Sequence, residues 1–352
     1  MRVLFDARSV RTPTGRYVLT GLASAWRRDA RVEEVLAAVP QGADRSQLPA
    51  DIAVVPLPAS EPWLKHVTST LVRAADRVRA DVIFCANGTG PRDRRSVLYF
   101  QDLFHFRYRD GGLPLKARLL EAGRASWRAL SAGRSGLGVA VSQAIADEAR
   151  EDVRALPIVE IPNGVEVGAL RWRGEDDVVF VTGGSGSRKG EETAVRAWAR
   201  LRRQTSSSVL EIGGVDPAGR REELQRLVND LELSKVVRIH GPLPRPAYLE
   251  RIASARLTVA CSRLESFGLP VAEALAIGAP LLCTDLAAHR ELLGRAGAGE
   301  SFPTGDDGAL AIRLGRVLAG EMPHRLESPP VGWDWTARGR EHIDAYERYV
   351  HA

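Results

Sequence analysis

The chain has 352 residues, of which 44% are hydrophobic and 26% are charged, and its formal net charge is +5. This length and composition favour two folded domains, and no long low-complexity or strongly charged block indicates disorder. The basic excess lies between residues 92 and 134, where 10 basic side chains accompany 4 acidic ones. Such a segment suits a phosphate-bearing substrate or an anionic membrane surface, and a plain solvated surface is the alternative. Aromatic residues are few and no nucleic-acid-binding motif is visible, which argues against nucleic acid as a partner.

The three cysteines, Cys85, Cys261 and Cys283, each lie in an apolar run and lack the spacing of metal ligands. This pattern predicts small buried side chains in a reducing compartment, with neither a disulfide nor a metal site. The N-terminus enters a strand-like run directly, and no stretch reaches the roughly 18 apolar residues of a membrane-spanning helix. We therefore expect a cytoplasmic protein, with peripheral membrane contact through the basic segment as an alternative.

In the first half of the chain, short β-rich runs alternate with amphipathic stretches. Helices are predicted over residues 15–29, 63–79, 115–132 and 142–153, the last with Ser142 as its N-cap. Strands are predicted at residues 2–7, 35–40, 52–57, 81–87, 96–102 and 136–142.

A second series follows, with strand-like runs that are each followed by a helical stretch. These runs are residues 177–184, 208–214, 236–241, 256–262 and 280–285, and an amphipathic helix over residues 333–350 closes the chain. Alternation of this kind indicates parallel sheets covered on both faces. We predict an α/β protein with two Rossmann-like doubly wound domains, residues 1–168 and 169–330, that face one another across a cleft, followed by a C-terminal helix, residues 331–352.

The loop Gly183–Gly190 is a candidate binding site, because ligands of open parallel sheets bind beyond the carboxyl ends of the strands. Its glycines, Gly184 among them, let backbone amides approach a ligand closely, and the helix that follows offers a partial positive charge. Arg188 and Lys189 add two full charges, so the loop suits a diphosphate. It lacks both the Walker A order and the third glycine of the dinucleotide fingerprint. A glycine-rich surface turn with two solvated cations is the alternative.

A second candidate lies in the loop after residues 256–262, where Glu265 precedes a helix that Pro270 suits at its first turn. Glu273 falls about one turn into that helix, and the amides around Gly268 are placed for an anion. Two carboxylates that flank an anion site can bind hydroxyl groups on both sides of a diphosphate, which is the layout of a nucleotide sugar.

The residues Glu265–Glu273 (ESFGLPVAE) resemble the Glu-x7-Glu motif of retaining glycosyltransferases with the GT-B fold, family 4 (glycosyl transferases group 1) in particular. Residues 241–285 resemble the C-terminal domain of that family over most of its length, and GGSGSRKG resembles its glycine-rich loop. Residues 141–150 and 161–166 resemble the end of its N-terminal domain. The closing helix is similar to the one that crosses back onto the N-terminal domain.

The resemblance implies transfer of a hexose-type sugar from a UDP-, GDP- or dTDP-sugar to an acceptor hydroxyl, with retention of anomeric configuration. Arg188 and Lys189 would bind the leaving diphosphate and Glu265 would face the transferred sugar, as the catalytic residues. Further donor contacts would be made by Glu273 (ribose), by Ser266, Phe267, Gly268 and Leu269 (sugar or phosphate), by Gly241 and Leu243 (base), and by Thr14 and Gly15 in the first loop (diphosphate).

One position departs from the family pattern. Many members have a His-Asp pair where this chain has Gln101 and Asp102, and His105 lies three residues further on. We keep Asp102 and His105 as candidate binding residues; a histidine packed between two phenylalanines is the plainer interpretation of His105.

No convincing Asp-x-Asp metal site is present, so we expect the two cations of the glycine-rich loop to replace a divalent metal, with no cofactor besides the donor. The sequence does not identify the acceptor, and a glycan, a lipid-linked molecule and a small molecule all remain candidates. Alternatives are an epimerase or phosphorylase that uses the same nucleotides, a catalytically degenerate binding partner, and an NAD-dependent oxidoreductase, against which the missing dinucleotide fingerprint argues.

Overall fold

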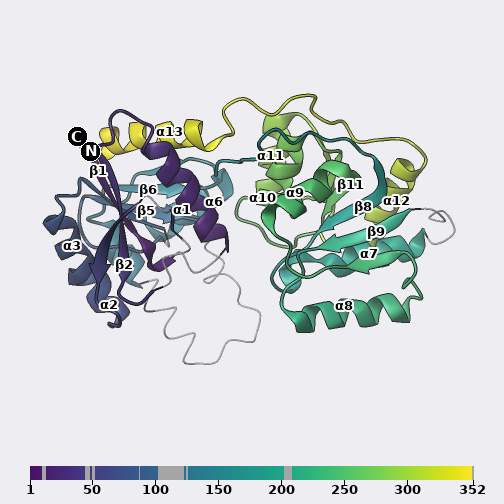
Figure 1. Ribbon diagram of the computed structural model, residues 1–352, viewed down its shortest axis with the longest axis horizontal. Helices are drawn as coiled ribbons and strands as arrows, with labels where there is room; N and C mark the ends of the chain where they lie inside the picture. The colour runs from purple at the N-terminus through teal and green to yellow at the C-terminus, as the bar shows by residue number, and fades with distance from the viewer. Residues whose placement is uncertain are drawn as a thin grey trace. The chain divides into compact units, whose positions relative to one another are not determined.

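The computed structural model describes residues 1–9, 13–43, 48–49, 52–86, 88–101, 123, 126–201 and 208–350. The chain divides into two compact units (Figure 1). Unit 1 contains Met1–Gly164 and Gly332–Ala352, and unit 2 contains Val165–Val331. The C-terminal segment is therefore part of the N-terminal unit.

Unit 1 is built on a seven-stranded sheet in the order β3-β2-β1-β4-β5-β6-β7, with every neighbouring pair parallel. Its strands are β1 (Arg2–Asp6), β2 (Glu34–Pro40), β3 (Ala53–Leu57), β4 (Val82–Cys85), β5 (Ser96–Phe100), β6 (Leu137–Ala140) and β7 (Ile158–Glu160). Runs of buried Val, Ile, Leu and Phe form the central strands, as expected of a parallel sheet covered on both faces.

The helices of unit 1 flank this sheet. Among the described residues they include α1 (Pro13–Trp26), α2 (Trp63–Lys65), α3 (Leu71–Arg77), α6 (Gln143–Asp152) and α13 (Trp335–Tyr349), with a short 3-10 turn η1 (Ala7–Ser9) after β1. The segment η2 (His66–Thr70), a π-helical turn, joins α2 to α3. Ser142 caps α6 by accepting a hydrogen bond from the Ile145 amide, as the sequence predicts.

The helix α13 packs beside α1 in unit 1 (Figure 1). Its first residue, Trp335, fills the space above two glycines: a Cβ on Gly21 would lie 2.2 Å from the Trp335 ring, and one on Gly164 would lie 2.4 Å from it. His342 and Tyr346 of the same helix pack against Trp26 of α1. The C-terminal helix thus completes the core of the N-terminal unit.

Unit 2 has a six-stranded parallel sheet in the order β10-β9-β8-β11-β12-β13, the strand order typical of dinucleotide-binding folds. Its strands are β8 (Asp176–Thr182), β9 (Val209–Gly213), β10 (Val237–Ile239), β11 (Ala255–Ala260), β12 (Leu281–Thr284) and β13 (Glu300–Phe302). Its helices are η3 (Ser187–Lys189), α7 (Glu191–Arg200), α8 (Ala218–Asp230), α9 (Arg245–Ser254), α10 (Leu269–Ile277), α11 (Ala287–Ala296) and α12 (Asp307–Leu318).

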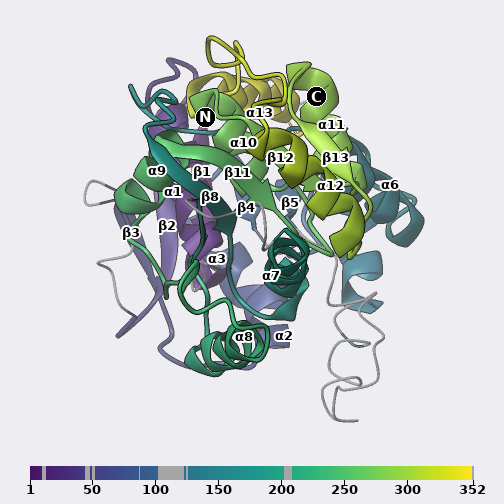
Figure 2. The same ribbon diagram turned by 90° about the vertical axis from the view of Figure 1, so that its right-hand side faces the viewer.

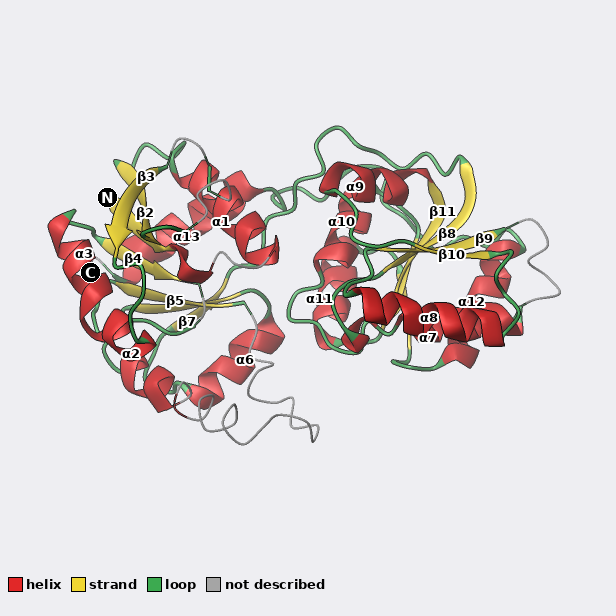
Figure 3. Ribbon diagram, turned by 60° about the horizontal axis from the view of Figure 1, so that its bottom comes forward, coloured by secondary structure: helices red, strands yellow, loops and turns green. Residues whose placement is uncertain are grey.

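The two faces of this second sheet are covered by different helices (Figure 3). On one face, α7, α8 and α12 form an apolar core with β8, β9 and β11 that includes the buried Trp198, and α7 and α12 pack side by side (Figure 2). On the other face, the ring of Tyr248 in α9 packs against Phe180 of β8, with ring centroids 5.7 Å apart. The helix α10 packs between α9 and α11.

The two parallel-sheet Rossmann-like units confirm the predicted fold class. All the predicted strands form, whereas β7, β13 and α12 were missed. A strand of three residues is too short to show the alternation on which strand prediction depends. The predicted helix 115–132 lies mostly outside the described residues. The part of it that the structure describes over 126–132 is helical.

Thr14 and Gly15 were expected in a loop, and this expectation is wrong: both lie in the first turn of α1. The reason is Pro13, whose fixed φ favours the first position of a helix, so that the helix begins earlier than the apolar pattern suggested. No helix of the described residues is long and apolar enough to span a membrane. The three cysteines are buried and free, as predicted.

Candidate functional site

The candidate site of unit 2 lies where β8 and β11 end. The loop Gly183–Gly190 follows β8 and closes with the turn η3, which carries Arg188 and Lys189. Gly190 has φ +64°, and a Cβ there would lie 2.3 Å from the Cys261 carbonyl oxygen, so only glycine fits. The Arg263 amide donates to the Arg188 carbonyl at 2.7 Å. This close approach brings the two predicted segments together.

Lys189 and Glu265 form the centre of the site. Lys189 Nζ lies 2.5 Å from Glu265 Oε1, which also accepts a hydrogen bond from Ser262 Oγ at 2.8 Å. Arg188 Nη1 lies 3.7 Å from Glu265 Oε2. Burial disfavours the charged Glu265 carboxylate, but Lys189 and Arg188 outweigh it and hold the pKa of Glu265 below its usual value. The carboxylate is therefore ionised at neutral pH.

The start of α10 lies beside this cluster. Its N-cap is Gly268, with φ +88°, and a Cβ there would lie 2.8 Å from His289 Cδ2. Leu269 and Pro270 begin the helix, as the sequence predicts, and Ser266 and Phe267 precede it. Its first turn contains no acidic residue, and its N-cap residue is a glycine, which has no side chain to cap it. A helix start of this kind favours an anionic ligand.

Glu273 lies deeper in α10 and is almost fully buried. Its Oε1 accepts from Arg245 Nη1 at 2.5 Å, and Arg245 Nη2 also donates to the Glu166 carbonyl at 3.1 Å. Burial outweighs the attraction of Arg245 and raises the pKa of Glu273. The Tyr248 hydroxyl lies in the field of Glu273, and burial raises its pKa well above the usual value, so it stays neutral.

Two residues of this site were missed in the sequence, Arg245 and Tyr248, and the buried His289 packs beneath it as a structural residue. His289 is buried under Gly268, its Nδ1 donates to the Thr284 carbonyl at 2.9 Å, and burial lowers its pKa. Arg245 and Tyr248 are three residues apart on α9, directly after the loop Gly241–Leu243, so their helical spacing was the signal available.

The loop after β10 carries the two predicted base contacts, Gly241 and Leu243. The Gly241 carbonyl accepts from the Gly214 amide at 3.1 Å, which places this loop beside the one after β9. A Cβ on Gly241 would lie 3.1 Å from Arg221 Nη1. The loop is therefore held next to the glycine-rich segments that follow the central strands.

Gly184 was expected to present its amide to a ligand. In the structure this amide donates to Glu191 Oε1 at 3.3 Å. Thr14 and Gly15 lie in unit 1, at the start of α1. Gln101 directly follows β5, whereas Asp102 and His105, like most of the basic segment 92–134, lie outside the described residues.

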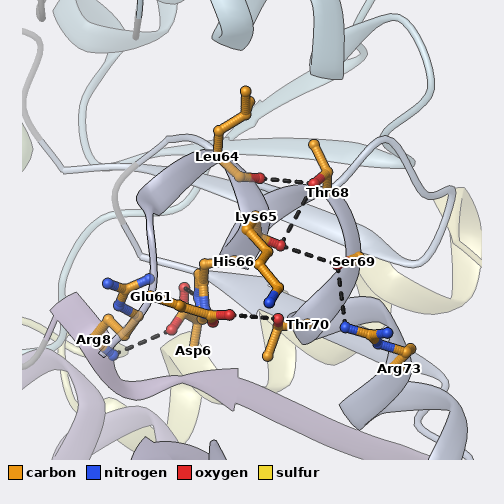
Figure 4. A network of polar contacts seen from close by, with 10 residues as sticks. All are labelled: Asp6, Arg8, Glu61, Leu64, Lys65, His66, Thr68, Ser69, Thr70 and Arg73. Atoms are coloured by element: carbon orange, nitrogen blue, oxygen red, sulfur yellow. Dashed lines mark hydrogen bonds and ion pairs between the residues drawn. The ribbon is translucent and has the colours of Figure 1, made fainter. Parts of the chain in front are cut away.

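Unit 1 has its own buried polar cluster at the carboxyl end of β1 (Figure 4). His66 Nε2 lies 3.0 Å from Asp6 Oδ2, and its Nδ1 lies 3.1 Å from Glu61 Oε1. Thr70 donates to Glu61 Oε2 at 2.7 Å, and the Arg8 amide donates to Asp6 Oδ1 at 3.2 Å. Burial disfavours the ionised Glu61, but Thr70 and His66 outweigh it and lower its pKa.

The described residues contain no group of three or more His, Cys, Asp or Glu side chains arranged to hold a metal ion. The polar cluster of unit 1 is held by the hydrogen bonds among Asp6, Glu61, His66 and Thr70 given above. In this cluster both ring nitrogens of the buried His66 have partners, whereas in the cluster of unit 2 the Arg188 side chain is partly exposed.

Comparison with solved structures defines the class of fold. Sucrose-phosphate synthase from Thermosynechococcus elongatus matches with a TM-score of 0.69 at 18% identity, covering 99% of this chain and 96% of that one. Anabaena HepE, solved in complex with UDP-glucose, matches with a TM-score of 0.67 at 16% identity, covering 99% and 95%. The chain has the GT-B fold of glycosyltransferase structures.

Sequence comparison relates the second unit to a known protein family. Residues 166–328 match the family "Glycosyl transferases group 1". The chain is 31% identical over 140 residues to a D-inositol 3-phosphate glycosyltransferase of Thermomonospora curvata, covering 36% of this chain and 32% of the relative. It is 27% identical over 192 residues to an MMP alpha-(1->4)-mannosyltransferase of Mycolicibacterium hassiacum, covering 53% and 46%. The matches thus span less than half the length of these curated relatives.

Proposed function

We propose that the chain is a glycosyltransferase that moves a hexose-type sugar from a nucleoside-diphosphate sugar to an acceptor hydroxyl, with retention of anomeric configuration. The observation that carries the proposal is the cluster of Arg188, Lys189 and Glu265 beside the start of α10, whose first turn has no acidic residue. This cluster lies inside the segment that matches the group 1 family. Support for the donor class comes from a neighbour of the same fold, solved with UDP and with UDP-glucose.

The charges of the cluster suit a departing diphosphate. In the structure, Glu265 neutralises Lys189 and lies near Arg188, so both cations are already oriented on an anion. A donor diphosphate at the start of α10 would take the place of that carboxylate as their partner. Fixed cations and helix-start amides then stabilise the charge that develops on the leaving group without reorganising. In this proposal they fill the role of a divalent metal.

The remaining contacts follow from the same placement. Glu273 would accept from the ribose hydroxyls, Glu265 would face the transferred sugar, and the backbone at Gly241 and Leu243 would contact the base. Unit 1, with Thr14 and Gly15, would bind the acceptor and approach the diphosphate. The three buried free cysteines support a cytoplasmic location.

A donor screen tests this function. The purified protein is incubated with UDP-, GDP- and dTDP-sugars, with and without EDTA, and release of the nucleoside diphosphate is measured. We expect release with one nucleotide family, unchanged by EDTA and reduced at least about 100-fold in Arg188→Ala/Lys189→Ala. The control is Arg290→Ala, which removes an exposed cation of the same unit.

Other outcomes would point elsewhere. Conversion of the sugar without release of the nucleotide would indicate an epimerase, and dependence on inorganic phosphate would indicate a phosphorylase. Thermal stabilisation by a nucleotide without any turnover would indicate a binding partner. Stabilisation by NAD alone would contradict the proposal.

A further inference from the structure

A buried carboxylate lies directly beneath the glycine-rich loop. Glu191, the first residue of α7, is 0% exposed. Its Oε1 accepts from the Gly184 amide at 3.3 Å, and its Oε2 accepts from Arg220 Nη2 at 3.2 Å. Burial raises its pKa, and its own amide, Arg220 and the Gly184 amide oppose that rise. An uncompensated buried carboxylate is costly, so these contacts are what keep it in place.

Glu191 occupies the position at the start of α7 that would otherwise suit an external anion. The free amides and dipole of a helix start stabilise negative charge, and here the chain supplies that charge itself. The start of α10 differs, because its first turn has no acidic residue. A diphosphate is therefore expected at α10, and Glu191 has a different task.

That task concerns the shape of the loop. The backbone of Asp216 fixes the loop through two hydrogen bonds: the Gly184 carbonyl accepts from the Asp216 amide at 3.2 Å, and the Gly186 amide donates to the Asp216 carbonyl at 3.1 Å. The Glu191 side chain provides a second set of contacts, because it accepts from the Gly184 amide and, through Arg220, connects the loop to α8. A Cβ on Gly183 would lie 3.3 Å from Glu191 Oε1, so the loop rests closely on this carboxylate.

We propose that Glu191 is a positioning residue for donor binding: it anchors the glycine-rich loop in the conformation that presents Arg188 and Lys189 to a nucleoside diphosphate. The inference rests on the proposed function. A simple electrostatic role would have the opposite sign, because a negative charge near a diphosphate repels it and its removal would strengthen binding. Substitution therefore separates the two roles by the direction of the effect.

The test measures binding of UDP, GDP and dTDP by calorimetry, taking the one that the unsubstituted protein binds best. Glu191→Ala should weaken that binding at least about 10-fold. Glu191→Gln keeps an oxygen for the Gly184 amide and should restore most of the lost affinity. The control is Glu222→Gln, which removes an exposed carboxylate of α8 and leaves Glu191, Arg220 and the loop contacts described above in place.

A second measurement distinguishes positioning from a general loss of structure. Binding of the matching nucleoside, which lacks phosphates, is followed by ligand-observed NMR. A positioning role leaves nucleoside affinity within about 2-fold in Glu191→Ala, whereas a distorted domain lowers both affinities. If Glu191→Ala fails to fold, both measurements are made on Glu191→Asp instead. This variant keeps the negative charge, but its shorter side chain holds the carboxylate further from the Gly184 amide.

Several outcomes would overturn the inference. Diphosphate binding that is unchanged or stronger in the folded alanine variant would do so, as would equal losses for diphosphate and nucleoside. Failure of the unsubstituted protein to bind any nucleoside diphosphate would refute the proposed function and the inference with it. Normal binding by the unsubstituted protein with an unaffected Glu191→Ala variant would refute the inference alone.

Discussion

Buried polar side chains are arranged differently in the two units. In unit 1, both ring nitrogens of His66 have carboxylate partners in Asp6 and Glu61, and the imidazole side chain is only 2% exposed. In unit 2, Glu265 has the buried Lys189 as its nearer partner, and the arginines beside Glu265 and Glu273 have side chains that are 39% and 38% exposed. A closed cluster has its partners within the fold, whereas an open one can exchange them for a ligand. We therefore expect the cluster of unit 1 to stabilise the fold and the cluster of unit 2 to bind a ligand.

Removal of Arg188 should give the largest effect on activity. Because its side chain is more than a third exposed and 3.7 Å from Glu265, Arg188→Ala should change the unfolding free energy by less than about 1 kcal/mol. It removes one cation from the proposed leaving-group site, so the rate of sugar transfer should fall roughly 100-fold or more. Steady-state kinetics and thermal melts measure the two quantities, and a loss of activity that tracks the melting temperature would break the comparison.

Substitution of His66 should lower stability and leave nucleotide binding unchanged. His66→Leu removes the hydrogen-bond partner that the buried Asp6 and Glu61 carboxylates share, and a buried polar group left unsatisfied costs about 1–3 kcal/mol. Urea denaturation measures this cost, with His324→Leu, at an exposed histidine, as the control. Nucleotide binding at neutral pH should not change; weakened binding in folded protein would contradict the division into closed and open clusters.

Acid should weaken unit 1 through His342. Burial lowers the pKa of this histidine from 6.5 to about 3, and its Nδ1 pairs with the Tyr346 hydroxyl at 3.0 Å. Because the folded pKa is the lower one, the unfolded chain takes up the proton first as pH falls. Stability is then lost at about 1.4 kcal/mol per pH unit between these two values.

Hydrogen exchange of the α1 and α13 amides at pH 7 and pH 5 measures this loss for unit 1 alone. We expect about 2 kcal/mol less protection at the lower pH from this residue. His342→Phe should remove that contribution to the slope. An unchanged slope in the phenylalanine variant would show that another group is responsible.

The smallest expected effect concerns two matched helix caps. Asp334 accepts from the Ala337 amide at the start of α13, and Asp306 accepts from the Ala309 amide at the start of α12. Replacing either by alanine should cost about 1 kcal/mol. Exchange protection should fall in unit 1 for Asp334→Ala and in unit 2 for Asp306→Ala, and a loss shared by both units would mean that they unfold together.

The sequence predicted the fold well because strand runs and amphipathic helices are local patterns. The approach of Glu265 to Lys189 was implied by the sheet rule, since both follow the ends of parallel strands. The Glu191–Gly184 contact was not foreseeable, because the direction of one amide depends on the neighbouring loop at Asp216. The pairing of Arg245 with Glu273 joins residues 28 positions apart, and no local period reveals such a contact.

The chain order of α13 has a consequence for biosynthesis. Unit 2 is one continuous stretch, so all its strands and helices are available once residue 331 has left the ribosome. Unit 1 begins first but lacks the Trp335 ring over Gly21 and Gly164 until α13 has been synthesised. Domains generally fold as units during translation. In this chain, the domain that starts first is therefore completed last, and its apolar surface around Trp26 awaits a helix made more than 300 residues later.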